Sequence, residues 1–270
     1  MKYEVVLSAY NDVDVLSVTL SGYLQQIDKD FSICIADDGS GLAVKELVDE
    51  YKDKGLNIRH VWHEDIGFRR AMILNKAVAS SCADRIIFSD SDCIPSRNFI
   101  SDHKRLYKEK TITTGPRVYL NEKITKDLKR KLKTPCYLKN TLKLLLLSIS
   151  KRVSRAEQGI RFPDVLTPFI RKLKDVWPYG ANFAVDRLDF LRVNGFDEDF
   201  VGWGGEDIDL HKRLKLDGID YLGVMGQAVL YHLHHPKRVA DDGDELLKQI
   251  KHDKRLHSQK FALNGVDNWL

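Results

Sequence analysis

The sequence lacks several features that would place it in other protein classes. None of its apolar runs is long enough to cross a bilayer, and the apolar stretch at its start is too short for a signal peptide. It has only four cysteines and no Cys-x-x-Cys pair. We expect all four to be reduced thiols in buried segments of a cytoplasmic protein. They are Cys34, Cys82, Cys93 and Cys136.

Glycine-rich phosphate-binding motifs are also absent. No Gly-x-Gly-x-x-Gly and no Gly-Lys-Ser/Thr follows any segment that reads as a strand. A dinucleotide site or a P-loop is therefore not expected, and a cation becomes the more natural partner for a bound diphosphate.

Positive charge is concentrated in one part of the 270-residue chain. The overall net charge is +4, but eleven Lys or Arg residues and one acid lie between Lys123 and Arg155. That stretch carries +10, so the remainder carries −6. The basic character is local, which predicts a surface patch and no general binding of nucleic acid.

Strand and helix patterns alternate over the first 95 residues. This alternation predicts an α/β fold with a mainly parallel sheet and right-handed crossovers. In such a sheet, ligands bind at the carboxyl ends of the strands. The expected strands are Tyr3–Ala9, Phe31–Ala36, Leu56–Trp62 and Arg85–Ser89, separated by expected helices at Val13–Ile27, Val44–Lys54 and Arg69–Ser80.

Polar residues follow three of these strands, namely Tyr10-Asn11, Asp37-Asp38 and Asp90-Ser91-Asp92. In extended backbone, Asp90 and Asp92 project to the same side. Two carboxylates on one side suit a hard divalent cation, which prefers oxygen ligands. The alternative is an ordinary acidic turn, because Asp-x-Asp alone is a weak signal.

Residues 117–176 interrupt the alternation and read as a basic helical insertion. A basic run at Lys126–Lys133 precedes a leucine cluster within Thr141–Ile149. One interpretation is an amphipathic element that lies on an anionic membrane surface. The other is a helical insertion whose leucines pack on the main domain while its lysines are solvated.

The second half contains a glycine-rich turn and a late histidine. Gly202-Trp203-Gly204-Gly205-Glu206-Asp207 opens a helix that ends near Gly218. Carboxylates in a first helical turn also suit the helix dipole, and that explanation suffices for Asp209. A strand expected at Ala228–Leu233 carries His232, and alternation would place His234 on the same face and His235 on the other. A single histidine there is often structural.

Taken in order, these motifs resemble those of GT-A glycosyltransferases. Asp37-Asp38-Gly39-Ser40, Asp90-Ser91-Asp92, the Trp-Gly-Gly-Glu-Asp element and Tyr231-His232 are similar to a bacterial family 2 enzyme. The C-terminal half resembles β-1,4-galactosyltransferases and chondroitin polymerase-type enzymes. The likeness implies a Rossmann-like GT-A domain. Residues 1–116 would then bind the nucleotide sugar, 117–176 would be the basic helical insertion, and 177–270 would bind the acceptor and catalyse transfer.

The resemblance also implies a role for each matching residue. Asp92 and His232 would hold Mn²⁺ or Mg²⁺, with His234 as the substitute ligand. Asp207 would be the catalytic base and Glu206 would hold sugar hydroxyls. The donor nucleotide would contact Tyr10, Asn11, Asp38, Arg70, Asn75, Asp90 and Ser91, and the sugars would contact Trp203, Gly204, Gly205 and Asn182.

The implied reaction is inverting transfer of a hexose or N-acetylhexosamine from a UDP-sugar to a glycan acceptor. We expect an acceptor of surface polysaccharide synthesis, either free or lipid-linked at the inner face of the cytoplasmic membrane. The competing hypotheses are a GT-A protein that binds sugar nucleotides without catalysis, a nucleotidyltransferase and a metal hydrolase. Leu7-Ser-Ala-Tyr-Asn-Asp12 lacks the glycine-rich basic loop of nucleotidyltransferases.

Overall fold

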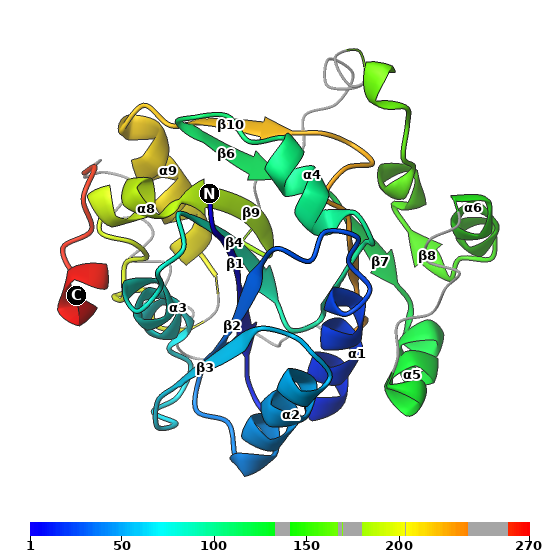
Figure 1. The fold of residues 1–270 in the computed structure, drawn as a ribbon, viewed down its shortest axis with the longest axis horizontal. Helices are drawn as coiled ribbons and strands as arrows, with labels where there is room; N and C mark the ends of the chain where they lie inside the picture. Colours follow the sequence, from blue (N-terminus) through cyan, green and yellow to red (C-terminus); the bar gives the residue numbers. More distant parts are fainter. Residues whose placement is uncertain (133–140, 167–168, 170–179, 203, 237–258) are drawn as a thin grey trace.

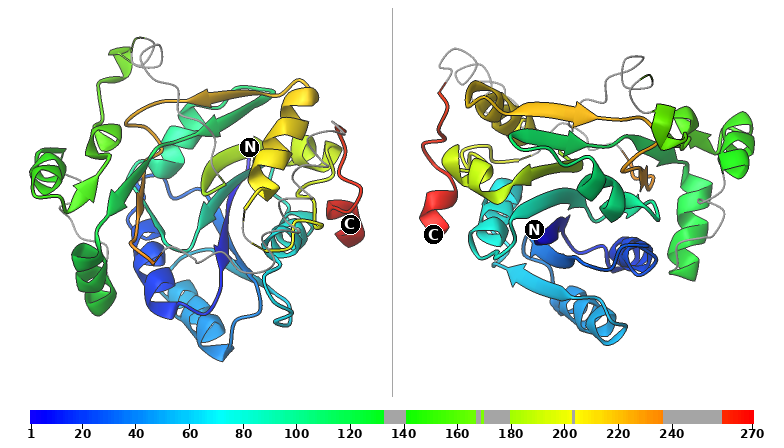
Figure 2. Two further views of the ribbon diagram at one scale, coloured as in Figure 1. Left: turned by 180° about the vertical axis from the view of Figure 1, so that it is seen from behind. Right: turned by 45° about the horizontal axis from the view of Figure 1, so that its top comes forward.

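The computed structural model describes residues 1–132, 141–166, 169, 180–202, 204–236 and 259–270. These residues form a seven-stranded sheet and a four-stranded sheet, with helices packed around both (Figure 1). Figure 2 shows the smaller sheet at one side of the larger one. Our expectation at Cys136 lies outside the described residues.

The large sheet is mainly parallel, which confirms the prediction from strand–helix alternation. Its order is β10-β6-β9-β4-β1-β2-β3, and β9 runs antiparallel to both of its neighbours. The other strand pairs of this sheet are parallel. The strands are β1 (Tyr3–Ala9), β2 (Ser32–Asp37), β3 (Ile58–Trp62), β4 (Arg85–Asp90), β6 (Thr111–Thr114), β9 (Asn182–Asp186) and β10 (Asp220–Gly223).

Helices cover both faces of the large sheet (Figure 1). Side chains alternate along β1, so that Val5 and Leu7 join one apolar cluster and Val6 joins the other. The first cluster includes residues of α1 (Val13–Tyr23), α2 (Leu42–Asp53) and α4 (Phe99–Arg105). The second includes residues of α3 (Arg70–Ala79), α8 (Arg187–Arg192) and α9 (Glu206–Leu216). This burial on both faces explains the nearly continuous apolar runs of the strands.

The small sheet has the order β5-β11-β7-β8. Its strands are β5 (Cys93–Pro95), β11 (Leu230–His232), β7 (Arg117–Leu120) and β8 (Val153–Ser154). The expected helical insertion at 117–176 is therefore wrong at its start, because Arg117–Leu120 pairs in parallel with β11. A strand of four residues is too short to show a periodic pattern in the sequence, and its partner β11 lies more than a hundred residues away.

Helices α5 (Glu122–Lys131) and α6 (Thr141–Ile149) flank the small sheet. Ile124, Leu128 and Leu144 pack into one apolar cluster with residues of β7, β8 and β11. Leu146 and Ile149 remain 56% and 81% exposed. The packing interpretation is therefore confirmed for Leu144, and the membrane interpretation stays a prediction. No helix in the described part of the chain is long and apolar enough to span a bilayer.

Two further expectations need correction. Helix α1 ends at Tyr23, short of the expected Ile27, and Leu24 is its C-terminal cap. Beyond the cap, the amide of Ile27 donates a hydrogen bond to the carbonyl of Arg97, in the segment after β5, and so leaves the helical pattern. Cys82 is exposed, since it lies in the loop between α3 and β4, whereas Cys34 and Cys93 are buried in strands as expected.

Phe88 is the centre of an aromatic cluster in the second core. Its ring lies 4.8 Å from Phe183, 5.5 Å from Phe190 and 5.2 Å from Phe196, and it is fully buried. Phe88→Ala should therefore lower the free energy of unfolding by about 3–5 kcal/mol in denaturant titrations. The matched control Phe261→Ala removes a 47% exposed ring and should change stability by less than about 0.5 kcal/mol. Equal losses in both variants would contradict this packing.

Candidate active site

Parallel pairing brings the polar residues after β1, β2 and β4 to one edge of the large sheet. In register, Ser8 of β1 lies beside Asp90 of β4, and Ala9 lies beside Asp37 of β2. The Ser8 hydroxyl donates a hydrogen bond to Asp90 at 2.8 Å. The carboxyl edge of the sheet therefore gathers acidic side chains, as the strand–helix pattern predicted.

Arg70, in the first turn of α3, joins this edge to the start of α9. Its guanidinium contacts Asp90 at 2.7 Å and Glu206 at 2.9 Å. Burial alone would raise the pKa of Asp90, but the Arg70 charge outweighs it and lowers that pKa. Burial raises the pKa of Glu206 despite the same arginine, and its second carboxylate oxygen is buried without a hydrogen-bond partner among the described residues. Arg70 therefore forms an ion-pair network with Glu206 and with Asp90, a residue that we predicted to contact the nucleotide.

Asp207 lies beside this network in the first turn of α9. Its carboxylate accepts hydrogen bonds from the amides of Gly180 and Ile208, both at 2.8 Å. A Cβ atom at Gly180 would lie 2.9–3.2 Å from Asp207 side-chain atoms, so only glycine permits this approach. Gly205 precedes the helix with φ 108°, a left-handed conformation that also favours glycine. The two glycines fix the orientation of the carboxylate.

Asp92 lies where the two sheets meet, between β4 and β5. Its Oδ2 atom is 3.5 Å from Nε2 of His232 and 3.5 Å from Nε2 of His235. Strand β11 ends at His232, so strict alternation does not continue and His235 turns toward Asp92. The structure therefore places His235 beside Asp92, where the sequence favoured His234. Its side chain is exposed, and its backbone amide bonds to Thr125.

The residues around Asp92 have suitable chemistry for a divalent metal ion. A carboxylate oxygen and two imidazole nitrogens lie within 4.8 Å of one another, and Asp90, Asp92 and Cys93 form a second such group. Carboxylate and imidazole together suit Mn²⁺, whereas Mg²⁺ prefers oxygen ligands alone. Burial lowers the pKa of His232, which favours the neutral imidazole that a metal requires.

The predicted nucleotide end is built around the loop after β2. Asp38 accepts hydrogen bonds from the Arg69 amide at 2.9 Å and from His63 at 2.7 Å, and burial raises its pKa. Asn11 accepts a bond from the Gly41 amide. Tyr10 is 49% exposed and donates to Asp65. Tyr10 and Asn11 therefore line an accessible rim, while Asp38 organises the loop beneath it.

Two predicted ligand-binding residues prove to be structural. Both N–H groups of Asn75 are used, by the carbonyl of Phe196 and by Glu198, and Asn75 is fully buried. Asn182 is likewise fully buried, bonding to the Ala228 carbonyl and facing His103. Burial and hydrogen bonding to neighbouring segments engage both amide groups, which favours a structural role over ligand binding.

Of the remaining predicted residues, Ser91 and Gly204 are described by the structure, and one residue near the site was missed. Ser91 joins β4 to the turn, with its amide bonded to Ser8 and its carbonyl to Thr19. Gly204 has φ 86°, and Trp203 lies outside the described residues. Arg117 was missed. Burial alone would lower its pKa, but nearby groups, including Asp90 and Asp92, raise it. It lies in β7, and the pairing of β7 with β11 is a long-range contact that the sequence could not reveal.

A comparison with protein families identifies the family to which this chain belongs. The model of "Glycosyltransferase like family 2" matches residues 8–240. The chain belongs to glycosyltransferase family 2. This confirms the resemblance inferred from the motifs.

Curated relatives of the chain include a glucosyltransferase, a chondroitin synthase and a galactosyltransferase. Validoxylamine A glucosyltransferase of Streptomyces hygroscopicus subsp. jinggangensis is 29% identical over 231 residues, covering 80% of this chain and 51% of the relative. Chondroitin synthase of Escherichia coli is 26% identical over 247 residues, covering 86% of this chain and 34% of the synthase. Human β-1,4-galactosyltransferase 2 is 27% identical over 100 residues, covering 37% of this chain and 27% of the relative. The chain spans about half the length, or less, of these relatives.

Solved structures confirm the GT-A fold of the glycosyltransferase. Residues 1–349 of Staphylococcus aureus TarS, in complex with UDP-GlcNAc, superpose with a TM-score of 0.61 at 14% identity, covering 93% of this chain and 64% of that one. The mannosyltransferase PcManGT of Pyrobaculum calidifontis, in complex with GDP-Man and Mn²⁺, superposes with a TM-score of 0.56 at 16% identity, covering 94% of this chain and 61% of that one.

Asn75→Ala should distinguish a structural role from nucleotide binding in this glycosyltransferase. Because it leaves Glu198 and a backbone carbonyl with one partner fewer, we expect the free energy of unfolding to fall by about 1–3 kcal/mol. Affinity for UDP, measured by calorimetry, should not change. The control Asn57→Ala truncates an exposed side chain and should alter neither quantity. Unchanged stability with weakened UDP binding would restore Asn75 to the nucleotide site.

Proposed function

We propose that the protein is an inverting, metal-dependent transferase that moves a hexose or N-acetylhexosamine from a UDP-sugar to a glycan hydroxyl in bacterial surface polysaccharide synthesis. One observation carries this proposal. Arg70 joins Asp90 to Glu206; a candidate cation cluster at Asp92 follows Asp90 in the chain, and an oriented carboxylate at Asp207 follows Glu206. That arrangement supplies separate groups for the leaving diphosphate and for the incoming hydroxyl.

The donor end of the proposed site serves the nucleoside diphosphate. Asp92 and His232 would hold Mn²⁺, which as a Lewis acid neutralises the charge that develops on the departing diphosphate. Asp90, fixed by Ser8 and Arg70, would position the donor. Tyr10 and Asn11 would border the nucleoside. The complex of TarS with UDP-GlcNAc supports a UDP-sugar as the donor. The complex of PcManGT with GDP-Man makes a GDP-sugar the alternative donor.

The acceptor end serves the incoming hydroxyl. Two backbone amides fix the Asp207 carboxylate, and its remaining lone pairs can accept the hydroxyl proton. The Glu206 oxygen that has no hydrogen-bond partner among the described residues can accept a bond from a sugar hydroxyl. One base and in-line displacement invert the anomeric centre and need no covalent nucleophile. Trp203, Gly204 and Gly205 would border the acceptor sugar.

The region around α5 and α6 supports a lipid-linked acceptor at an anionic membrane. Exposed apolar side chains at Leu146 and Ile149 occur on a segment that carries +10 between Lys123 and Arg155. Exposed apolar groups with nearby cations favour binding at the surface of an anionic bilayer. The enzyme would then bind the inner leaflet peripherally, where such acceptors are presented.

Asp207→Asn tests the proposed base. The amide keeps the shape of the side chain but cannot take up the proton, so we expect sugar transfer to fall by about 10²–10⁴-fold. UDP affinity, measured by calorimetry, should stay within twofold. The control Asp209→Asn alters a carboxylate that pairs with Arg213 within the same helix, and it should retain transfer. Full activity in Asp207→Asn would overturn the base assignment. Intact UDP binding in a wild-type protein without transfer or donor hydrolysis would favour the non-catalytic binding protein.

Vesicle sedimentation tests the membrane contact. Leu146→Glu with Ile149→Glu should reduce binding to vesicles of phosphatidylglycerol and phosphatidylcholine by about tenfold, because it removes apolar contact and adds repulsive charge. The control Leu188→Glu changes a 70% exposed leucine on α8, at the opposite side of the molecule (Figure 1), and should bind like the wild type. Equal binding by all three proteins would refute the membrane contact.

A further inference from the structure

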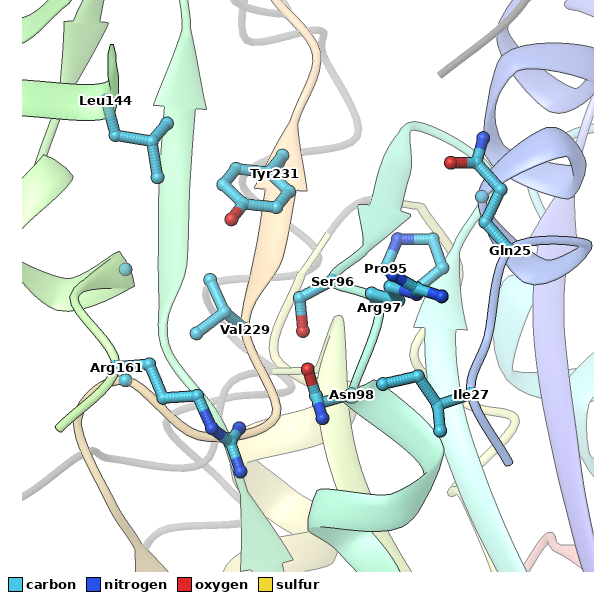
Figure 3. A pocket seen from close by; sticks show the side chains of 13 residues that line it. Gln25, Ile27, Pro95, Ser96, Arg97, Asn98, Leu144, Arg161, Val229 and Tyr231 are labelled. Atoms are coloured by element: carbon cyan, nitrogen blue, oxygen red, sulfur yellow. The ribbon is translucent and has the colours of Figure 1, made fainter. Parts of the chain in front are cut away.

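A cavity of about 280 Å³ lies on the face of the small sheet that points away from Asp92. Along β11, successive side chains project to opposite sides of the strand. His232 lies beside Asp92, whereas Tyr231 lines the cavity (Figure 3). The other walls include the end of α1, the start of α4, α6 and the segment around η2 (Ala156–Gly159). The cavity is therefore separate from the candidate active site.

Backbone contacts hold the walls of this cavity in place. The amide of Ser96 donates a hydrogen bond to the carbonyl of Val229 at 2.9 Å. The amide of Ile27 donates one to the carbonyl of Arg97 at 3.1 Å. A Cβ atom at Gly226 would lie 2.0 Å from a carbonyl oxygen of the segment after η2, so only glycine permits this close approach. The cavity is thus formed before any ligand binds, as small-molecule sites usually are.

Three consecutive residues form the polar part of the lining. Ser96, Arg97 and Asn98 join β5 to α4. Figure 3 shows the side chains of Ser96 and Asn98 pointing toward one another in the cavity. Within the described part of the chain, no hydrogen bond or ion pair engages the Ser96 hydroxyl, the Arg97 guanidinium or the Asn98 side-chain amide. These groups can therefore bond to a ligand without breaking a contact of the protein.

Arginine residues make the lining positively charged. Arg161 lines the cavity and contacts Asp102 at 2.8 Å, and Arg105 contacts the same carboxylate at 3.0 Å. Two guanidinium groups thus share one buried carboxylate, which leaves a net charge of +1. Arg97 is exposed and adds a second positive charge, which no carboxylate of the described residues pairs. An anionic ligand would be attracted to this lining.

Apolar groups form the rest of the lining. They are the side chains of Ile27, Pro95, Leu144, Val229 and Tyr231. An alkyl chain could fill this part, but it would displace water from Ser96, Arg97 and Asn98 without replacing the lost hydrogen bonds. A sugar ring has C–H groups on its faces and hydroxyls around its edge, so it matches both parts of the lining. The volume lies just below the range of roughly 300–1,000 Å³ for ligand pockets, which suits one sugar residue.

We propose that this cavity is a second saccharide-binding site, which holds one negatively charged sugar residue. Arg97 and Arg161 would contact the carboxylate or phosphate group of that sugar. Ser96 and Asn98 would bond to its hydroxyls, and the Tyr231 ring would pack against its C–H groups. The site goes beyond the proposed transfer reaction, because it lies on the other face of the small sheet. It would hold the protein on an anionic glycan whether or not a donor is bound.

Methyl-labelled NMR of the full chain tests this site directly. Glucuronate, glucose 6-phosphate, glucose, inorganic phosphate and octyl phosphate would each be titrated, with UDP and Mg²⁺ present to occupy the proposed donor site. The reporters are the methyl groups of Ile27, Leu144 and Val229 in the cavity, and Leu188 on α8 is the distant control. Both anionic sugars should shift the three reporters but not Leu188. They should also bind at least ~10-fold more tightly than glucose, because hydrogen bonds to charged groups are the stronger ones.

Two variants identify the groups that bind the sugar. Arg97→Ala removes an exposed charge and should weaken both anionic sugars by ~10-fold without changing the affinity for glucose. Asn98→Ala removes bonds to hydroxyls and should weaken all three sugars by ~5-fold. Neither side chain bonds to the described protein, so both variants should keep the melting temperature of the wild type. The control Lys108→Ala removes an exposed lysine from the loop after α4 and should match the wild type.

Several results would overturn the saccharide site. Reporters that neither anionic sugar shifts would do so, as would glucose that binds as tightly as glucuronate. Inorganic phosphate that binds as tightly as glucose 6-phosphate would mean a plain anion site, and tighter binding of octyl phosphate would mean a lipid site. Equal losses in Lys108→Ala and Arg97→Ala would mean non-specific attraction of charge. None of these results concerns transfer at Asp207, so the proposed function would stand.

Discussion

The buried charge of Arg70 is the interaction on which the site depends. Its side chain is 13% exposed, and a guanidinium in such a place is costly unless carboxylates pair with it. Asp90 after β4 and Glu206 at the start of α9 supply that pairing from segments far apart in the sequence. The pairing fixes where α9 begins relative to the sheet. It also engages two of the gathered acids, so that Asp92 and Asp207 remain for a cation and a hydroxyl.

A large part of this arrangement follows from sequence pattern. Alternating strands and helices require parallel pairing, and parallel pairing places every strand end at the same edge. Asp38, Asp90 and Asp92 could therefore be assigned to one edge from their positions alone. Glu206 and Asp207 could be assigned to a helix start because two glycines precede them. These predictions rest on backbone geometry, which local sequence controls.

The remainder depends on contacts that local sequence does not encode. Asn75 lies on the helix that follows the nucleotide loop, but Glu198, more than a hundred residues later, takes up its amide. Asn182 is occupied in the same way by Ala228. The faces of His234 and His235 depended on where β11 ends, and the strand itself exists because β5 and β7 pair with it. In each case, long-range burial or pairing decides which polar group remains free.

The proposed function requires that Asp92 bind a nucleoside diphosphate through a metal ion. The most direct measurement is thermal stabilisation of the wild type and Asp92→Asn by UDP, with and without Mn²⁺. At a hundred times its dissociation constant, a ligand should stabilise the wild type by about 2.7 kcal/mol, only when Mn²⁺ is present, and the variant should lose this effect. Metal-independent stabilisation of equal size in both proteins would contradict the claim, as would the absence of any effect with UDP, GDP or dTDP.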